Sequence, residues 1–242
     1  MTLLPRFLAL IFFFLLWCGL ASGCREAVTR QVTARVLSIH GPVTFAIDEQ
    51  TDFRPVALES RLPVGSSVRA FDGSWLDLAL LPGVLLRLSS NSEIKIEELR
   101  ISKNGNQPEG GMRSRIARVQ LNRGEIVVLF NRPDKSASQF AVGVRKVRIT
   151  ADSDCLFRVR DHEATTRLTC VQGKVSAAHG SQPPVSIGAG YFQQWPSDRS
   201  EPVAATGDAA AQIDITDSLE IENQLLELWS NWQNRRPFHP VR

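Results

Sequence analysis

The stretch LALLPGVLLRLSSNSEIKI, from Leu78 to Ile96, decides how this chain folds. Two apolar runs of strand length flank Pro82-Gly83, and a Ser-Asn break separates the second run from a third. Proline and glycine together are a strong turn signal, and short apolar or alternating runs between turns are typical of β-strands. The stretch contains no histidine, cysteine or paired acids. It therefore predicts a sheet that presents a surface, and no catalytic centre.

The same pattern of short strands separated by turn residues continues in both directions along the chain. A strand, a Gly41-Pro42 turn and a second strand are predicted for VTARVLSIHGPVTFAI, and a turn at residues 122–124 divides ARVQLNRGEIVVLF. The strand-like pieces contain about five to seven residues and recur with regular turn signals, which indicates an all-β domain. Helical crossovers are absent from the pattern, so a parallel α/β sheet is not expected.

Polar, glycine-rich and proline-rich segments are predicted to be the loops of the β-domain and the linker that follows it. Residues 102–116 and 131–138 are predicted to be polar loops within the β-domain, which is assigned to residues 33–195. Residues 196–212 are rich in Pro, Ala, Ser, Asp and Gly and are predicted to be a linker. Residues 213–242 then form a C-terminal helix and tail.

The C-terminal segment DITDSLEIENQLLELWSNWQNRR contains one amphipathic helix, predicted at residues 217–234. Asp217 is the expected N-cap, with Glu220 three residues further on. One face carries apolar side chains, namely Leu219, Leu225, Leu226, Trp229 and Trp232. This face is predicted either to pack on the β-domain or to bind a partner, with Leu225, Trp229 and Trp232 as the candidate contacts.

The N-terminus reads MTLLPRFLALIFFFLLWCGLASGC, which is the plan of a secretory signal peptide. Leu20-Ala21-Ser22-Gly23-Cys24 resembles a bacterial lipobox, although the pattern usually has leucine where Ala21 stands. The prediction is a signal peptide over residues 1–23 and lipidation of Cys24. Cleavage by an ordinary signal peptidase after Gly23 and retention of the apolar run as a short anchor remain open. In all three cases residues 25–242 lie outside the cytoplasm.

Charge and composition exclude one class of partner. The chain has 242 residues and a net charge of +3, and removal of residues 1–24 takes away one arginine and no acid. The mature chain then has 27 basic and 25 acidic residues, whereas a nucleic-acid-binding surface needs a regional basic excess. Nucleic acid is therefore not expected as a partner.

The glycine-punctuated strands resemble the FecR domain, a module of bacterial periplasmic and envelope proteins. The matching segments are HGPV, LPVGSSVRAFDGSWLDLALLPGVLLRLSSNSEIKI, LNRGEIVV and TCVQGKVSA, with Gly65, Gly83, Leu86, Leu88, Ser92 and Ile94 in the preferred places. DSDCLFRV keeps Phe157 and Val159 but lacks the family's Gly-Thr. The resemblance covers roughly residues 33–195 and implies a rolled sheet or a twisted β-solenoid.

Well-known members of that family carry signals to a sigma factor through a cytoplasmic region that precedes their membrane helix. Only six residues precede the apolar run here. The resemblance is therefore expected to extend to an envelope module and not to the sigma-factor role. Arg25 follows Cys24 where an aspartate would signal inner-membrane retention, which favours an outer-membrane lipoprotein on the periplasmic face of the envelope.

Motifs for catalysis and for cofactors are missing from the sequence. There is no G-x-S-x-G, Walker loop, H-E-x-x-H or dinucleotide fingerprint, and the four histidines are scattered. Asp161-His162-Glu163 and the pair Asp152 and Asp154 are the only metal-like groups, and a solvated turn and a polar strand entry explain them better. The sequence predicts a non-enzymatic protein without a cofactor.

Cys155 and Cys170, in CLFRVRDHEATTRLTC, are predicted to form a disulfide. A hairpin with its turn at residues 161–164 would place them directly opposite each other, on the same face as Phe157 and Leu168. The inferred compartment is oxidising. The alternative is a pair of reduced thiols packed in the core.

A basic patch is expected at VRKVRIT, where Arg145, Lys146 and Arg148 surround apolar residues. A solvated strand face is the favoured interpretation, and contact with acidic lipid or glycan is the alternative. The leading prediction is an envelope lipoprotein whose β-domain binds an envelope protein or polysaccharide. A membrane-anchored periplasmic sensor is the first alternative. A glycan-active enzyme is the second, but no pair of acids supports it.

Overall fold

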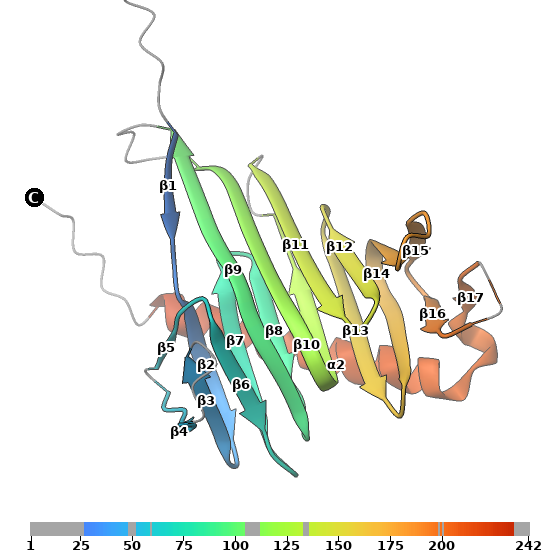
Figure 1. Cartoon of the computed structure of the whole chain (residues 1–242), viewed down its shortest axis with the longest axis horizontal. Helices are drawn as coiled ribbons and strands as arrows, with labels where there is room; N and C mark the ends of the chain where they lie inside the picture. The colour runs from blue at the N-terminus through green and yellow to red at the C-terminus, as the bar shows by residue number, and fades with distance from the viewer. Residues whose placement is uncertain are drawn as a thin grey trace, which may run out of the picture.

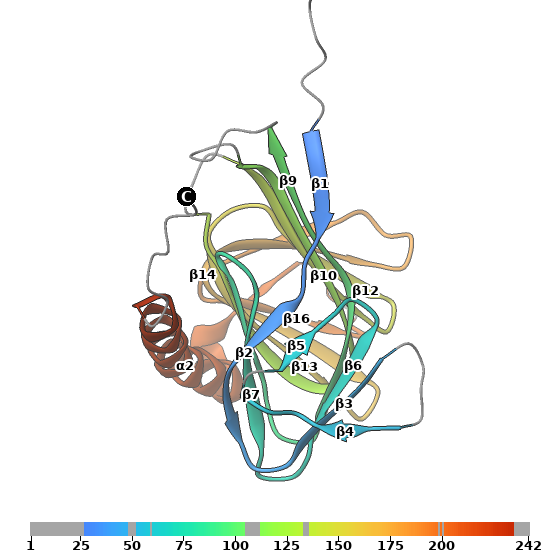
Figure 2. The same ribbon diagram turned by 90° about the vertical axis from the view of Figure 1, so that its left-hand side faces the viewer.

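In the computed structural model, residues 27–47, 52–58, 60–104, 112–132, 136–197, 199 and 201–234 are described. Two β-sheets, here called sheet A and sheet B, stack face to face, and helix α2 (Ala209–Asn234) covers the outer face of sheet B. Figure 2 shows the three layers, with α2 on one side, β2 and β7 next, and β3 and β6 beyond them. In Figure 1 sheet A lies in front and α2 behind.

Sheet A contains, in spatial order, β4 (Arg54–Pro55), β3 (Val43–Ile47), β6 (Ser66–Ala70), β9 (Ser92–Asn104), the first part of β10 (Met112–Phe130), β11 (Ala137–Val144), β12 (Val147–Ala151), the second part of β14 (Thr165–His179) and β15 (Val185–Gly188). Strand β1 (Ala27–Gln31) pairs with the end of β9, beyond β6.

Sheet B contains, in order, β5 (Arg61–Leu62), β2 (Ala34–His40), β7 (Trp75–Leu81), β8 (Val84–Leu88), the second part of β10, β13 (Cys155–His162), the first part of β14, β16 (Tyr191–Trp195) and β17 (Val203–Ala204). A 3-10 turn, η1 (Ala205–Gly207), leads from β17 to α2.

The chain advances by making a hairpin in one sheet and then crossing to the other. Hairpins β7–β8 and β13–β14 lie in sheet B, whereas β9–β10 and β11–β12 lie in sheet A. Because β10 and β14 belong to both sheets, strands β10, β11, β12, β14 and β13 close into a barrel. The rolled, solenoid-like all-β fold expected from the sequence is confirmed.

Two glycines allow β10 and β14 to pass between the sheets. Gly124 and Gly173 have φ values of +85° and +70°, a conformation that glycine adopts at little cost. Each also lies against neighbouring backbone, because a Cβ atom on Gly124 would lie 2.6 Å from the Cα atom of Ser92. The turn predicted at residues 122–124 is therefore a bend inside one continuous strand.

The main core fills the space between the sheets. Alternate residues of the strands point inward, and the largest of these side chains, such as Phe130, Phe140 and Phe157, are fully buried. Sheet B also buries its outer face under α2, so residues 126–130 are all buried. Burial on two faces explains the continuous apolar run IVVLF, in which a strand exposed on one face would alternate.

Helix α2 begins at Ala209, before the predicted cap Asp217. Asp208 is the actual N-cap, since its Oδ1 accepts a hydrogen bond of 2.8 Å from the backbone N–H of Ala211. This hydrogen bond, assisted by Arg167, lowers the pKa of Asp208 below its ordinary value. The predicted linker at residues 196–212 is thus corrected, because it contains β17, η1 and the first turn of α2.

An apolar stripe on α2 packs against the outer face of sheet B. Leu225 is fully buried there among Leu37, Leu85 and Leu129, and this burial contributes about 1.5–3 kcal/mol. Ile215, Ile221, Leu228, Trp229 and Trp232 are partly buried around it. Leu219 and Leu226 were predicted on the same face but are 38% and 41% exposed, because this side of the helix does not face sheet B.

Strands β1, β9 and β10 extend beyond the body of the sandwich, as both views show (Figures 1 and 2). Both ends of the predicted loop at residues 102–116 belong to strands instead, because β9 continues to Asn104 and β10 starts at Met112. The predicted loop at residues 131–138 similarly ends where β11 begins at Ala137.

Candidate interaction surfaces

A ladder of charged side chains lies beneath α2 on sheet B. Asp77 is fully buried and accepts hydrogen bonds of 2.6 and 2.8 Å from Arg87, its direct cross-strand partner, and another from Ser38. Arg87 also donates to Gln224 of α2 at 2.7 Å. Bidentate pairing satisfies both charges, and the ladder connects the helix to the three strands β2, β7 and β8.

A second buried cluster connects the first half of α2 to β13. Asp214, with 1% of its side chain exposed, lies 3.4 Å from Arg158 and 2.8 Å from Arg160, and it accepts a hydrogen bond of 3.0 Å from Thr169. Glu125 pairs with both arginines from the other side. The arginines share two carboxylates, which is the compensation that buried charge requires.

These contacts make α2 part of the body of the protein. Of the predicted partner-binding residues, Leu225 is buried, while Trp229 and Trp232 are half-buried and stack on each other at 5.0 Å. The guanidinium of Arg35 lies 5.5 Å above the Trp232 ring. The predicted apolar face therefore packs mainly on the β-domain, and only the tryptophan end borders an open groove with β2.

A polar cleft of ≈740 Å³ lies between the end of β8, the bend of β10 and the end of β13. It is lined by polar side chains, among them Asn91, Asn122, Arg123, Arg145, His162 and Glu163. Below its rim, Asp161 is 4% exposed, pairs with Arg145 at 2.5 Å and accepts a hydrogen bond of 3.0 Å from Thr166. We call this feature the distal cleft.

The distal cleft lies at the opposite end of sheet A from the N-terminal strand. Strand β9 begins beside the cleft, where Glu93 pairs with Arg123, and ends where Asn104 pairs with Ala27 of β1. Its 13 residues span about 40 Å at roughly 3.3 Å per residue. The start of β1 therefore lies far from the distal cleft.

The predicted basic patch is divided between two surfaces. Arg145 lies at the β11–β12 turn, forms an ion pair with Asp161 and lines the distal cleft. Arg148 points outward from sheet A, because its neighbours Val147 and Ile149 face the core. Lys146 is exposed on the turn between them. The two arginines therefore serve different surfaces.

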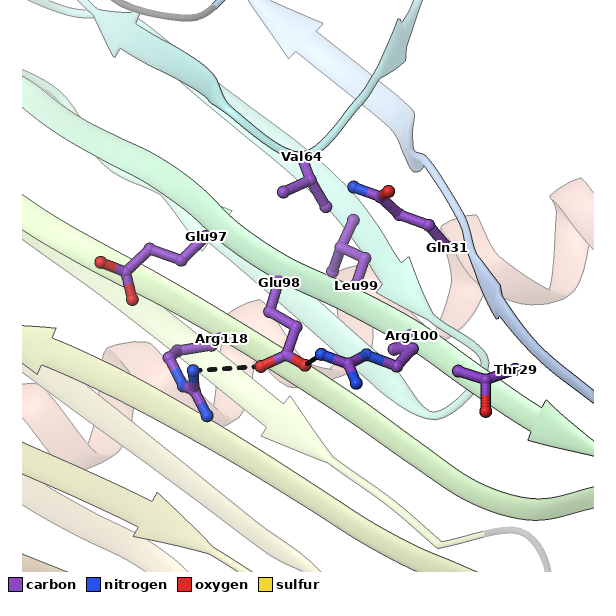
Figure 3. Close-up of a pocket in the computed structure, with 8 residues that line it drawn as sticks. All are labelled: Thr29, Gln31, Val64, Glu97, Glu98, Leu99, Arg100 and Arg118. Carbon is purple, nitrogen blue, oxygen red and sulfur yellow. Dashed lines mark hydrogen bonds and ion pairs between the residues drawn. The ribbon is translucent and has the colours of Figure 1, made fainter. Parts of the chain in front are cut away.

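Among the charged side chains on the outer face of sheet A, opposite α2, basic residues outnumber acidic ones. Outward-pointing positions hold Arg69, Lys95, Arg100, Arg118, Arg148 and Lys174, against the acids Glu93, Glu97 and Glu98. Figure 3 shows Glu98 between Arg118 and Arg100, and Glu97, Gln31 and Thr29 line the same pocket. We call this surface the basic face.

Within the described residues, no three His, Cys, Asp or Glu side chains converge as a metal site would need. Asp161 is held by an arginine and a threonine, while His162 and Glu163 are more than 80% exposed. The solvated turn expected for this triplet thus applies to His162 and Glu163 and is wrong for Asp161. Asp154 accepts a backbone hydrogen bond from Arg132.

Cys155 and Cys170 are buried free thiols in this structure. The predicted register was wrong by two residues, because the hairpin turn is Glu163-Ala164, with both residues at positive φ. Phe157 lies opposite Cys170, and after a bulge Cys155 lies opposite Gly173. The cysteines are therefore not the directly opposed pair on which the predicted disulfide depended.

We expect both thiols to resist alkylation in the folded protein at pH 8. Burial raises the pKa of Cys170 to about 12 and that of Cys155 further, so the reactive thiolate is scarce. Iodoacetamide followed by peptide mapping should modify both cysteines only after unfolding without reductant. Recovery of the two peptides joined by a disulfide would contradict the free thiols.

The described part of the chain contains no helix with the length and hydrophobicity needed to cross a membrane. Cys24 and the predicted signal peptide lie outside the described residues.

Sequence reasoning missed the buried charges and the distal cleft. Single charged residues inside apolar runs, such as Asp77 in WLDLALL and Arg158 in CLFRV, were the available signal. Such a residue must find a partner when both faces of its strand are covered.

The chain is similar to known proteins over part of its length. Residues 66–176 match the family model described as FecR protein. Two solved structures of a candidate anti-sigma factor from Parabacteroides distasonis ATCC 8503, at 2.50 and 1.65 Å resolution, match with 14% identity and a TM-score of 0.40. Each match covers 57% of this chain and 57% of the other. No curated protein matches the chain.

Proposed function

We propose that this chain is a non-enzymatic binding module of the bacterial envelope, because residues 66–176 match the FecR protein family model. In this proposal a lipid on Cys24 holds the protein at the periplasmic face of the outer membrane. The β-domain then engages an envelope protein or polysaccharide. The proposal keeps the family's envelope setting and requires no catalytic residue.

The position of the distal cleft carries the proposal. The two residues between Cys24 and Ala27 leave little slack, so β1 would start close to the membrane. The cleft would then face away from the membrane at the far end of sheet A, about 40 Å along β9. A polar cleft with amide, guanidinium and carboxylate groups suits a hydrated partner.

Site-specific photocrosslinking in cells tests this role. A photoreactive residue in place of Asn122, in the distal cleft, is expected to give a reproducible adduct. The matched position Asn223, exposed on α2, should give none. Glu163→Lys, which changes an exposed cleft residue, should reduce the Asn122 adduct. Equal labelling at Asn122 and Asn223, or none at either, would reject the cleft as a binding site.

A periplasmic sensor is the second candidate function. Residues 66–176 match the FecR protein family model, and the resemblance to the signalling members of that family favours this role. The two functions predict different N-termini. Mass spectrometry should find a diacylglyceryl group on Cys24 for the anchored module, whereas an intact Met1 end would support a retained anchor and a sensor.

A further inference from the structure

We infer that the basic face of sheet A binds an acidic polysaccharide along a path that crosses strands β9, β10, β11, β12 and β14. The inference takes one premise from the proposed function, namely that the protein is located in the bacterial envelope. It concerns a different surface from the distal cleft.

Positive charge exceeds negative charge on this face. Glu93 is shared by Arg69 at 2.8 Å and Arg123 at 3.8 Å, and Glu98 is shared by Arg118 at 3.1 Å and Arg100. A carboxylate between two guanidinium groups cancels only one of the two charges. Arg148 and Lys174 have no ion-pair partner among the described residues.

The opposite side of the molecule has the reverse polarity. Helix α2 has no lysine or arginine, and four of its five acids reach the surface, namely Asp217, Glu220, Glu222 and Glu227. The separation of charge between the two outer surfaces orients an approaching polyanion toward sheet A.

The spacing of the cations favours a polymer over a small anion. The strand register places Lys95, Gln120, Gly143 and Arg148 in one row across β9, β10, β11 and β12. Three strand intervals of about 4.8 Å separate the two cations of this row by roughly 14 Å. One phosphate or carboxylate cannot span that distance, whereas a chain with repeated anionic groups can.

Small and polar residues form a low floor between these cations. The side chain of Gln120 lies over Gly143, since a Cβ atom there would be 2.1 Å from the Gln120 Oε1. Ala141, Thr150 and Ser176 continue the floor in the neighbouring row. Amide and hydroxyl groups at this level can hydrogen-bond to sugar hydroxyls without blocking the chain.

The chemistry of the face argues against a protein or a membrane as its ligand. Protein interfaces usually depend on aromatic or aliphatic anchors, and peripheral membrane proteins insert apolar side chains. The most exposed large apolar residues of the described chain are Val28, Leu58, Phe71, Tyr191, Ile213, Leu219 and Leu226. None occupies an outward position on the five strands of the proposed path.

Titration of the mature protein with alginate oligosaccharides tests the inference. We expect binding at low ionic strength that weakens as salt is added, because exposed charges are screened. Arg148→Glu combined with Lys174→Glu should weaken binding at least about tenfold, which corresponds to 1.4 kcal/mol. The control, Arg61→Glu with Arg132→Glu, makes the same change in net charge off this face and should alter affinity less than about twofold.

Thermal unfolding should show that both double variants remain folded. Absence of alginate binding, equal weakening by the two double variants, or tighter binding to phosphatidylglycerol vesicles than to alginate would each overturn the inference. None of these results alters the crosslinking expected at Asn122, so failure here is distinguishable from failure of the proposed function.

Discussion

Asp214→Ala is expected to destabilise the protein by about 3–5 kcal/mol, as loss of one partner from a buried ion pair typically does. Asp214 is almost fully buried. It forms ion pairs with Arg158 and Arg160 and accepts a hydrogen bond from Thr169. Alanine would leave Arg158, which is 3% exposed, with only Glu125 at 3.6 Å and Asp217 at 3.5 Å. The cost arises because Arg158 keeps only these two longer ion pairs and Thr169 loses its acceptor, and not from lost apolar area.

Urea unfolding and thermal unfolding measure this effect. For a domain of this size, 3 kcal/mol lowers Tm by roughly 6–12 °C. Glu227→Ala is the matched control, since it removes an acid from the exposed side of the same helix and should cost less than about 0.5 kcal/mol. Asp214→Asn should be intermediate, because the amide oxygen still accepts hydrogen bonds. A loss below about 1 kcal/mol for Asp214→Ala would show that the cluster does not stabilise the helix on the sheet.

Local turn chemistry was predictable from sequence. Gly41 and Gly83 both adopt positive φ at predicted turns, because only glycine enters this conformation cheaply and its position is therefore encoded locally. The register of β13 and β14 was not predictable in this way. Their turn uses Glu163 and Ala164 at positive φ, and neither residue type signals that conformation.

Long-range pairing explains the remaining misses. Arg158 lies 56 residues from Asp214, and Arg87 lies 137 residues from Gln224, so no sequence period links them. A charged residue in a short strand is ordinarily read as solvent-facing, because strands of a sheet with one buried face alternate apolar and polar residues. That reading fails where α2 covers the second face of sheet B. The start of α2 was missed because Ala209-Ala210-Ala211 follows a Gly- and Pro-containing segment that resembles a linker.

Gly173→Ala is expected to cost about 3 kcal/mol through two separable effects. A residue with a side chain at φ +70° costs about 1–2 kcal/mol. The new Cβ atom would also lie 2.1 Å from the backbone oxygen of Asp154, so the strand must shift, and such overpacking typically costs 1–3 kcal/mol. Backbone on both sides of the contact leaves no flexible side chain to move aside.

Gly180→Ala separates the two effects, because Gly180 has φ +58° but nothing lies within 4 Å of a Cβ atom there. Its expected cost is about 1 kcal/mol, the conformational part alone. The difference between the two variants in urea unfolding therefore measures the close approach of β14 to the β12–β13 crossing. If the strand path through Gly173 closes the barrel, Gly173→Ala must lower the free energy of unfolding by about 1 kcal/mol more than Gly180→Ala does, or by a larger margin. Equal costs would mean that β14 crosses between the sheets without this contact, and the barrel closure described above would need a different path.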